Sequence, residues 1–262
     1  KIIQSINIVA KFENIKTKYA KVILSKIVKK FLDAEKALDE FNIRRYLQVS
    51  FYDVFNIMQQ FFRETDNIDD FLLVFKLIIV DWLKVLSLTI PHLCEELWEL
   101  AGNKGFISTS IWGDFDQKYI DQNLEVEFEY ISQVIEDIFN IKKIVNIQEI
   151  NIIYLYTAPD WKYKAKSLIL STKGNFNSII SELKKEKDLM TNKQLIPYIK
   201  TQLKDKIWEK KSYILDEIKS LEDYKSYIEK RVNSSIIINS EFDPKQRAIR
   251  AKPFKPALYI DV

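Results

Sequence analysis

The one histidine and the one cysteine of the chain lie together in the segment TIPHLCEELWEL, residues 89–100. His92 and Glu95 are three residues apart, so a helix would place both on one face, as it does with zinc-peptidase ligand pairs. A third ligand, usually another histidine, is missing, and Cys94 would point away on the same helix. The other interpretation is a helix started by Pro91, whose acidic residues complement the positive end of its dipole. We favour this helix and expect no bound metal.

Other catalytic patterns are missing from the sequence as well. Gly102 and Gly105 do not follow a strand, so they predict no phosphate-binding glycine loop, and His92 has no candidate nucleophile at a motif-like spacing. A single cysteine excludes an internal disulfide and a cysteine-cluster zinc site, and it fits a reducing, cytoplasmic setting. The residues therefore predict no catalytic site and no cofactor in this chain. They leave open whether the chain is part of an enzyme.

Basic residues gather near the C-terminus. The net charge of the 262-residue chain is only +3. Residues 244–256, however, contain five basic and no acidic side chains: Lys245, Arg247, Arg250, Lys252 and Lys255. Phe254 and Tyr259 lie among or beside them, and such cations contact phosphates while exposed aromatic tips stack on the splayed bases of RNA loops. The alternative is a solvated loop between two strands, with both aromatic rings in the core.

The first half of the chain is predicted to form antiparallel helices. Between residues 33 and 64, apolar residues recur every three or four positions and predict the buried face of a long helix. These residues are Ile43, Leu47, Phe51, Val54, Phe55, Met58 and Phe62. Thr65-Asp66 would then cap a very apolar helix over residues 68–90. Lys76, Asp81 and Lys84 interrupt that segment, so we expect a buried helix and no membrane span.

Two further amphipathic helices complete this part. The helix that starts at Pro91 would end at Gly102. Its inward residues are predicted to be Leu93, Cys94, Leu97, Trp98 and Ala101, opposite a solvated face with His92, Glu95, Glu96 and Glu99. After a loop, another apolar periodicity predicts the next helix, through Leu124, Phe128, Ile131, Ile135 and Ile138.

The pattern changes near residue 147. Residues 150–156 are rich in β-forming side chains, helical stretches follow at about 160–170, 176–188, 192–209 and 212–231, and two strands are predicted in SSIIINSEFD and in the C-terminal PALYIDV. The predicted fold class is mainly α: an antiparallel helical bundle over residues 1–145, then a small α+β domain with a few-stranded sheet over residues 146–262.

Three segments resemble a known family. LTIPHLCEELWEL, a loop and IWGDF resemble the closing helix of the anticodon-binding bundle of class I aminoacyl-tRNA synthetases, where the loop ends in Trp-Pro; here Gly113 replaces that proline. FNIRRYLQVSFYDVFNIMQQFFRE is similar to the preceding helix of that bundle. IIYLYTAPDWKYKA and KPFKPALYIDV resemble the C-terminal domain of leucyl-tRNA synthetases of the archaeal and eukaryotic type. Together the resemblance covers nearly the whole chain.

The resemblance implies a partner and a set of contact residues. In that family the bundle packs on the tRNA and the C-terminal domain reaches the long variable arm, so the implied partners are tRNA, specifically tRNA(Leu), and a catalytic domain of the same polypeptide. Lys252 and Lys255 would neutralise phosphates, and Arg44 and Arg45 would contact RNA from the bundle. The implied contacts of the tail are Pro256, Ala257, Leu258, Tyr259, Ile260 and Asp261.

The resemblance also implies what this chain leaves to other parts of a synthetase. No segment matches the His-Ile-Gly-His or Lys-Met-Ser-Lys-Ser signatures of the catalytic domain, so ATP, leucine and zinc would be bound only there. We expect a monomer without a membrane partner. The alternative is a degenerate synthetase paralogue that serves as an RNA- or protein-binding scaffold without aminoacylation.

Overall fold

The computed structural model of the chain describes residues 11–113, 115–145, 151–184, 192, 194–204 and 215–261. The chain forms two compact units, one ending at Glu129 and the other starting at Tyr130. This division falls within helix α6 (Gln122–Val145). The domain boundary expected after residue 145 stays a prediction.

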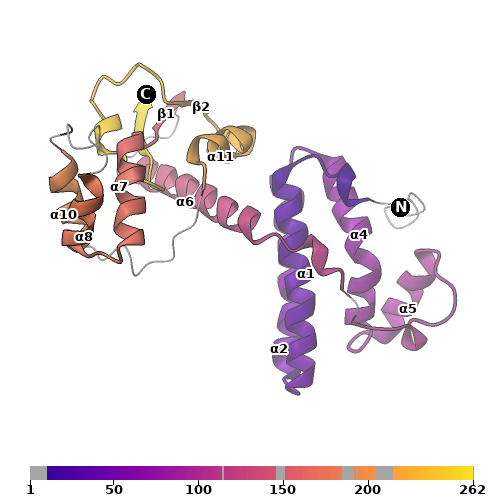
Figure 1. Ribbon diagram of the computed structural model, residues 1–262. Coiled ribbons are helices and arrows are strands. Elements are labelled where there is room, and N and C mark those ends of the chain that lie inside the picture. Colours follow the sequence, from indigo (N-terminus) through magenta and orange to yellow (C-terminus); the bar gives the residue numbers. More distant parts are fainter. Residues whose placement is uncertain are drawn as a thin grey trace. The chain divides into compact units, whose positions relative to one another are not determined.

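The first unit is helical (Figure 1). Its α-helical elements before α6 are α1 (Lys18–Asp39), α2 (Ile43–Leu47), α3 (Val54–Glu64), α4 (Ile68–Leu86) and α5 (Pro91–Leu100). Short helical turns add η2 (Phe12–Asn14), the π-helical η3 (Gln48–Asp53), η4 (Ile107–Thr109) and η5 (Gln117–Tyr119). Helix α1 contacts α2, α3 and α4, and its apolar face is fully buried at Val22, Leu24 and Ile27.

A buried carboxylate joins α4 to the start of α1. Asp70 is 0% exposed, and its two oxygens accept the N–H groups of Lys16 at 2.9 Å and Thr17 at 2.8 Å. The Thr17 hydroxyl donates to the same carboxylate at 2.6 Å. Because the first N–H groups of a helix have no partner within it, a carboxylate at this point satisfies donors and complements the dipole. The sequence pattern did not indicate this contact, which spans more than fifty residues.

The long amphipathic helix predicted over residues 33–64 is wrong in its buried face and in its continuity. Helix α1 ends at Asp39, and α2, η3 and α3 form the next helical stretch. Of the predicted inward residues, Val54 and Met58 are buried. The others are between 36% and 56% exposed: Ile43, Leu47, Phe51, Phe55 and Phe62.

The buried face keeps Val54 and Met58 and is completed by Tyr46, Val49 and Phe61 in place of Leu47, Phe51 and Phe62. A π-helical turn closes its hydrogen bonds over five residues instead of four, so it changes which side chains face inward. The indole of Trp82 donates to the Ser50 carbonyl at 2.8 Å within this turn, and the Tyr46 hydroxyl donates to the Val85 carbonyl. Both hydrogen bonds join this stretch to α4. Local periodicity carries no information about such a contact between helices.

Helices α4 and α5 follow the prediction with small differences. Asn67 caps α4 by accepting the N–H groups of Asp69 and Asp70, in place of Thr65-Asp66. The helix ends at Leu86 instead of residue 90. At this end the hydroxyls of Ser87 and Thr89 donate to carbonyls of the last turn.

Helix α5 begins at Pro91 as predicted, and Cys94 and Trp98 are buried, but Leu93 is 50% exposed and not inward. Gly102 has the positive φ of 82° that ends such a helix. Among the residues that the structure describes, no helix combines the length and apolar character needed to cross a membrane.

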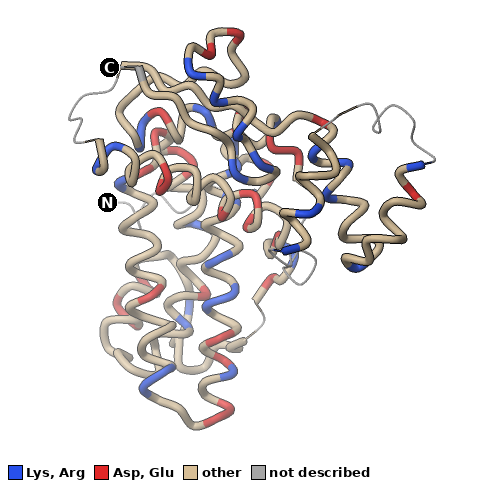
Figure 2. Tube along the Cα trace, turned by 90° about the vertical axis from the view of Figure 1, so that its left-hand side faces the viewer, with Lys and Arg blue, Asp and Glu red and all other residues tan. Residues whose placement is uncertain are grey.

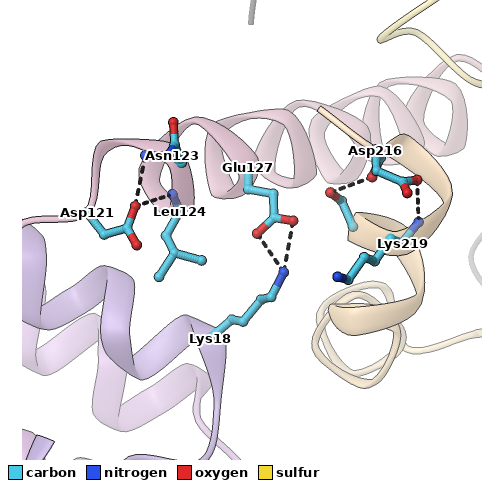
Figure 3. Close-up of polar contacts among 8 residues, drawn as sticks. Lys18, Asp121, Asn123, Leu124, Glu127, Asp216 and Lys219 are labelled. Carbon is cyan, nitrogen blue, oxygen red and sulfur yellow. Dashed lines mark hydrogen bonds and ion pairs between the residues drawn. The ribbon is translucent and has the colours of Figure 1, made fainter. Parts of the chain in front are cut away.

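The last helix of this series confirms its predicted apolar face. Phe128, Ile131, Ile135 and Ile138 are all buried in α6, and Leu124 is half-buried. Asp121 begins the helix by accepting the N–H groups of Asn123 and Leu124 at 3.0 and 3.1 Å (Figure 3). Glu127, one turn later, binds the ammonium of Lys18 at 2.8 Å (Figure 3).

The second unit contains a three-stranded mixed sheet with the order β2-β1-β3. The central strand β1 (Ile152–Tyr156) pairs in parallel with β2 (Ser235–Ile238) and antiparallel with β3 (Ala257–Asp261). Its described helices are α7 (Asp160–Ser171), α8 (Phe176–Leu183), α10 (Leu195–Lys204), α11 (Glu217–Asp223), α12 (Lys225–Val232) and the turn η7 (Ala248–Arg250). The predicted fold class is therefore confirmed.

Parts of five predicted elements, at residues 150, 185–188, 193, 205–209, 212–214 and 262, lie outside the described residues.

The two faces of the sheet differ. One face buries the aliphatic side chains of Ile153, Leu155 and Ile236, and the other buries the aromatic side chains of Tyr154 and Tyr156. On the other face the register aligns Tyr154 with Ile237 of β2 and Tyr259 of β3. Side chains alternate along each strand, so Tyr259 shares this second face while Leu258 and Ile260 share the first. Phe242, in the segment that joins β2 to β3, contacts the rings of Tyr154 and Tyr259 on this second face.

Candidate nucleic-acid interface

The predicted basic residues lie in one loop, residues 243–255, which we call the basic loop. Lys245, Arg250, Lys252 and Lys255 are exposed and Arg247 is half-buried. None of the five side chains forms an ion pair with a residue that the structure describes. Elsewhere basic and acidic residues are interspersed (Figure 2), so this loop is a local concentration of unneutralised positive charge.

A tight turn at the end of the loop brings two lysines together. Lys252 and Lys255 form an isolated antiparallel bridge, with reciprocal N–H to carbonyl distances of 3.0 and 2.8 Å. Pro253 and Phe254 are the central residues, and Phe254 has a φ of 65°. Proline followed by a residue of positive φ is the pattern of a type II turn, in which the second position is usually glycine. The turn therefore places two like charges opposite each other, an arrangement that a bound anion would stabilise.

Side chains from the sheet and from the loop itself order the first part of the loop. Asp243 accepts the N–H groups of Arg247 at 2.7 Å and Ala248 at 2.8 Å. The hydroxyl of Tyr156, on β1, donates to the carbonyl of Phe242. These hydrogen bonds are made to backbone groups of the loop, so they do not use the basic side chains.

Two buried charged residues contact the second part of the loop from the neighbouring helices. Lys162 of α7, 5% exposed, donates from Nζ to the carbonyls of Ile249 at 2.7 Å and Ala251 at 2.6 Å. Burial lowers the pKa of Lys162, and the nearby positive charge of Lys252 lowers it further. A buried ammonium that donates hydrogen bonds to two carbonyls has a structural role and is not a contact for solvent or RNA.

The second of these residues is Glu217, in the first turn of α11. Asp216 caps that helix by accepting the N–H of Lys219 (Figure 3). Glu217 is 2% exposed and accepts the Tyr163 hydroxyl. Burial raises the pKa of Glu217 to about 7, and the nearby polar groups of the Phe254 backbone and of Tyr130 oppose the rise. The Tyr130 hydroxyl faces the same carboxyl without hydrogen-bond geometry, so Oε1 has no partner among the described residues.

The ring of Phe254 is held by its neighbours. It contacts the rings of Tyr130 and Tyr163, both with centroids 6.4 Å away, and the ammonium of Lys166 lies 3.8 Å from its centroid. Burial lowers the pKa of Lys166 to about 8. Phe254 is therefore half-buried in the unit instead of being a free stacking residue.

Tyr259 belongs to a small aromatic group on the second face of the sheet. Its ring centroid lies 5.8 Å from Tyr154 and 6.1 Å from Phe242, and the Lys245 ammonium lies 5.6 Å from it. Tyr259 is half-buried, whereas Phe242 is 50% exposed. Phe242 was missed in the sequence because a single aromatic residue in a turn carries no periodic signal.

The remaining predicted contacts are placed differently. Pro256 is buried, and Leu258 and Ile260 align with the buried Leu155 and Ile153 of β1. Ala257 and Asp261 lie at the ends of β3, where only the backbone of Asp261 is described. Arg44 and Arg45 are exposed on α2 in the first unit. Which of these side chains touch RNA stays a prediction.

The segment TIPHLCEELWEL has a structural role in the first unit. Glu95 accepts the N–H groups of Ile107 at 2.8 Å and Ser108 at 3.3 Å, and thereby orders the loop that follows α5. His92 is exposed on the same helix. The described part of the chain contains no group of three or more residues suited to hold a metal ion.

Comparison with known proteins identifies relatives of the chain. A family model described as the anticodon-binding domain of tRNA ligase matches residues 20–154. The leucine–tRNA ligase of Pyrococcus furiosus is 33% identical over 253 residues, which cover 95% of this chain and 26% of that protein. The leucine–tRNA ligase of Methanococcus vannielii is 35% identical over 231 residues, covering 87% and 23%. That of Archaeoglobus fulgidus is 26% identical over 240 residues, covering 91% and 24%.

The chain thus spans about a quarter of the length of these relatives. The matches confirm the resemblance to leucyl-tRNA synthetases of the archaeal type that the motifs indicated. The family model includes α2, α3, α4, α5 and α6 and reaches into β1, more than half of the chain. The chain belongs to the family of anticodon-binding domains of tRNA ligases.

Proposed function

We propose that this chain is the tRNA-binding portion of a leucine–tRNA ligase. It would position tRNA(Leu), through the body of the tRNA and its long variable arm, for aminoacylation by a catalytic domain that is not in this chain. ATP and leucine would be bound by that catalytic domain. Binding energy gained far from the reacting groups would then serve to place the acceptor end.

The observation that carries this proposal is the basic loop. Its five cations have no acidic partner among the described residues, its backbone is fixed by buried groups, and the aromatic group of Tyr259 and Phe242 lies beside Lys245. Cations on an ordered backbone lose little conformational entropy when they bind phosphates. The relatives' names support tRNA as the polyanion.

The proposal is tested by titrating the chain with an archaeal leucine tRNA and with the same tRNA shortened in its variable arm, each at two salt concentrations. Deletion of the C-terminal residues would remove β3, which pairs with the central strand β1, and would therefore disturb the sheet as well. Substitution of single side chains avoids this second effect. The variant Lys252→Ala/Lys255→Ala should weaken binding of the full tRNA roughly tenfold and lower the salt slope by about two, because two phosphate contacts are lost.

The control is Lys200→Ala, an exposed cation of α10 far along the sequence from the loop. It should change the affinity less than about twofold. If the basic loop contacts the variable arm, wild type should bind the full tRNA more tightly than the shortened one. Lys252→Ala/Lys255→Ala should bind the two tRNAs with similar affinity. Equal and weak binding of both tRNAs would contradict it and favour the degenerate scaffold.

A monomeric state and a cytoplasmic location stay predictions. Size-exclusion chromatography with light scattering measures the first directly, and a mass twice that of the chain would contradict it.

A further inference from the structure

We propose that Lys162 and Glu217 are positioning residues, which hold residues 249–254 in the conformation that presents Lys252 and Lys255 to the phosphates of an RNA. This inference rests on the proposed function and adds residues that contact no RNA themselves. Both are buried, and both carry an ionisable group. Lys162 bonds to two backbone carbonyls of the basic loop, and Glu217 accepts the hydroxyl of Tyr163, whose ring contacts Phe254 of the loop.

Lys162 fixes the entry to the turn. The carbonyls of Ile249 and Ala251 point at one ammonium, so the backbone on either side of Arg250 cannot rotate without breaking a charge-assisted hydrogen bond. Ala251 is 0% exposed, whereas Arg250 and Lys252 on either side of it are exposed. The buried cation therefore directs the backbone inward at Ala251 and the two neighbouring cations outward.

Glu217 fixes the turn itself. Phe254 has a positive φ of 65°, a backbone conformation that is strained for a bulky residue. The Tyr163 hydroxyl donates to the Glu217 carboxyl, and the Tyr163 ring contacts the ring of Phe254. The Phe254 backbone lies close enough to the same carboxyl to lower its pKa. Side chains outside the turn therefore hold Phe254 in this conformation. A type II turn without such contacts usually has glycine at this position. Lysines on a strained turn stay close together only while those contacts persist.

The charges around the site oppose the same conformation. Lys162, Lys166, Lys252 and Lys255 all approach the turn, and the positive charge of Lys252 lowers the pKa of Lys162. Repulsion among these cations would open the loop in the absence of RNA. The buried hydrogen bonds counteract this repulsion, so the positive groups are already assembled before a polyanion arrives.

The test compares Lys162→Met and Glu217→Gln with wild type in two independent measurements. The first is the affinity for archaeal leucine tRNA, as above. The second uses no RNA: trypsin cleavage after Arg247 and Arg250, relative to cleavage after Arg63 in the first unit. Lys252 and Lys255 precede prolines, so trypsin spares them. Lys162→Met should raise loop cleavage about fivefold or more and lower tRNA affinity about tenfold, with a smaller effect in the same direction for Glu217→Gln.

Matched controls lie on the same helices. Lys164→Met on α7 and Glu222→Gln on α11 make the same chemical changes at exposed positions. Neither should alter loop cleavage or tRNA affinity by more than about twofold. Thermal unfolding of all variants identifies any that have lost the fold. If Lys162→Met is one of them, Lys162→Gln is used in its place.

A double-mutant cycle separates positioning from general destabilisation. In the Lys252→Ala/Lys255→Ala background, Lys162→Met should have little further effect on tRNA affinity, because the contacts it positions are already gone. A full additional loss, or unchanged cleavage after Arg250 in Lys162→Met, would overturn the inference. If wild type shows no preference for tRNA, the proposed function fails, and the cleavage measurement alone decides whether Lys162 and Glu217 hold the loop.

Discussion

Single residues of this chain show how burial changes the chemistry of ordinary side chains. Glu217 and Lys162 are ionisable groups with almost no contact with solvent, and burial shifts the pKa of each toward its neutral form. For Glu217 the Phe254 backbone and Tyr130 oppose this shift of the pKa, whereas for Lys162 the positive charge of Lys252 in the basic loop adds to it. Stability and loop geometry are therefore coupled at these two positions.

The raised pKa of Glu217 makes its contribution to stability depend on pH. Its folded value of about 7 lies above the ordinary value of 4.5. The folded state therefore retains a proton that the unfolded state has lost, and stability falls as the pH rises from about 5 to about 8. Glu217→Gln has no proton to lose. Relative to wild type, its free energy of unfolding should increase by up to about 3 kcal/mol over this interval.

Urea unfolding of both proteins at the two pH values measures this difference. The other titratable groups at the site, Tyr130, Tyr163 and Lys166, are present in both proteins and contribute equally. The exposed Glu222→Gln should run parallel to wild type within about 0.5 kcal/mol. If Glu217→Gln also ran parallel to wild type, the pKa of Glu217 would be the same in the folded and unfolded states, which would contradict the prediction.

At the scale of elements, the α2–η3–α3 stretch carries two apolar faces side by side. One contains Tyr46, Val54 and Phe61 and is buried, and the other contains Phe51, Phe55 and Phe62 and is substantially exposed. The rings of Phe51 and Phe55 stack with centroids 6.2 Å apart on the exposed face. Hydrophobic periodicity alone scores both faces equally, and the π turn together with the bonds from Trp82 and Tyr46 distinguishes them.

Two adjacent phenylalanines test which face is buried. Phe61 is 0% exposed and contacts the rings of Tyr19 and Phe71, whereas Phe62 is 56% exposed. Phe61→Ala should lower the free energy of unfolding by about 3–5 kcal/mol, and Phe62→Ala by about 1 kcal/mol or less. Denaturant titration of the two variants measures this, each being the other's control. Similar losses would show that the predicted face is the buried one in solution.

At the scale of the whole molecule, charge is nearly balanced. A net charge of +3 over 262 residues gives little long-range attraction for a polyanion. The proposed binding of tRNA would then depend on local groups, and the predicted ones are the basic loop in the second unit and Arg44 and Arg45 in the first. Each phosphate contact contributes one released counterion, so the salt dependence counts the contacts.

Arg44→Ala/Arg45→Ala tests whether the first unit contributes to binding. If both arginines contact phosphates of the tRNA, the slope of log affinity against log salt should fall by about two. The free-energy loss should add to that of Lys252→Ala/Lys255→Ala, because the two pairs lie in separate units and share no partner. A salt titration of the two variants and their combination measures both quantities. An unchanged slope would confine RNA binding to the second unit.

Much of the architecture could be predicted from sequence, because the relevant forces act between near neighbours. Pro91 and Gly102 bound α5, the apolar residues of α6 are inward, and β1, β2 and β3 lie where β-forming residues gather. The basic loop was recognised from composition, and the family from its motifs. These features depend on local backbone preference and on spacing of 2 or 3.6 residues, which the sequence displays directly.

The tertiary structure alone decided the partners of the buried polar groups. Asp70 bonds to Thr17, Lys162 to Ile249 and Ala251, and Glu217 to Tyr163, across separations of 53 to 89 residues. A buried charge is stable only where donors or acceptors converge on it, and that convergence is produced by the packing of distant elements. Local pattern carries no record of it. For the same reason the sequence determined which residues are basic, and the fold determined that Lys252 and Lys255 stand together on one turn.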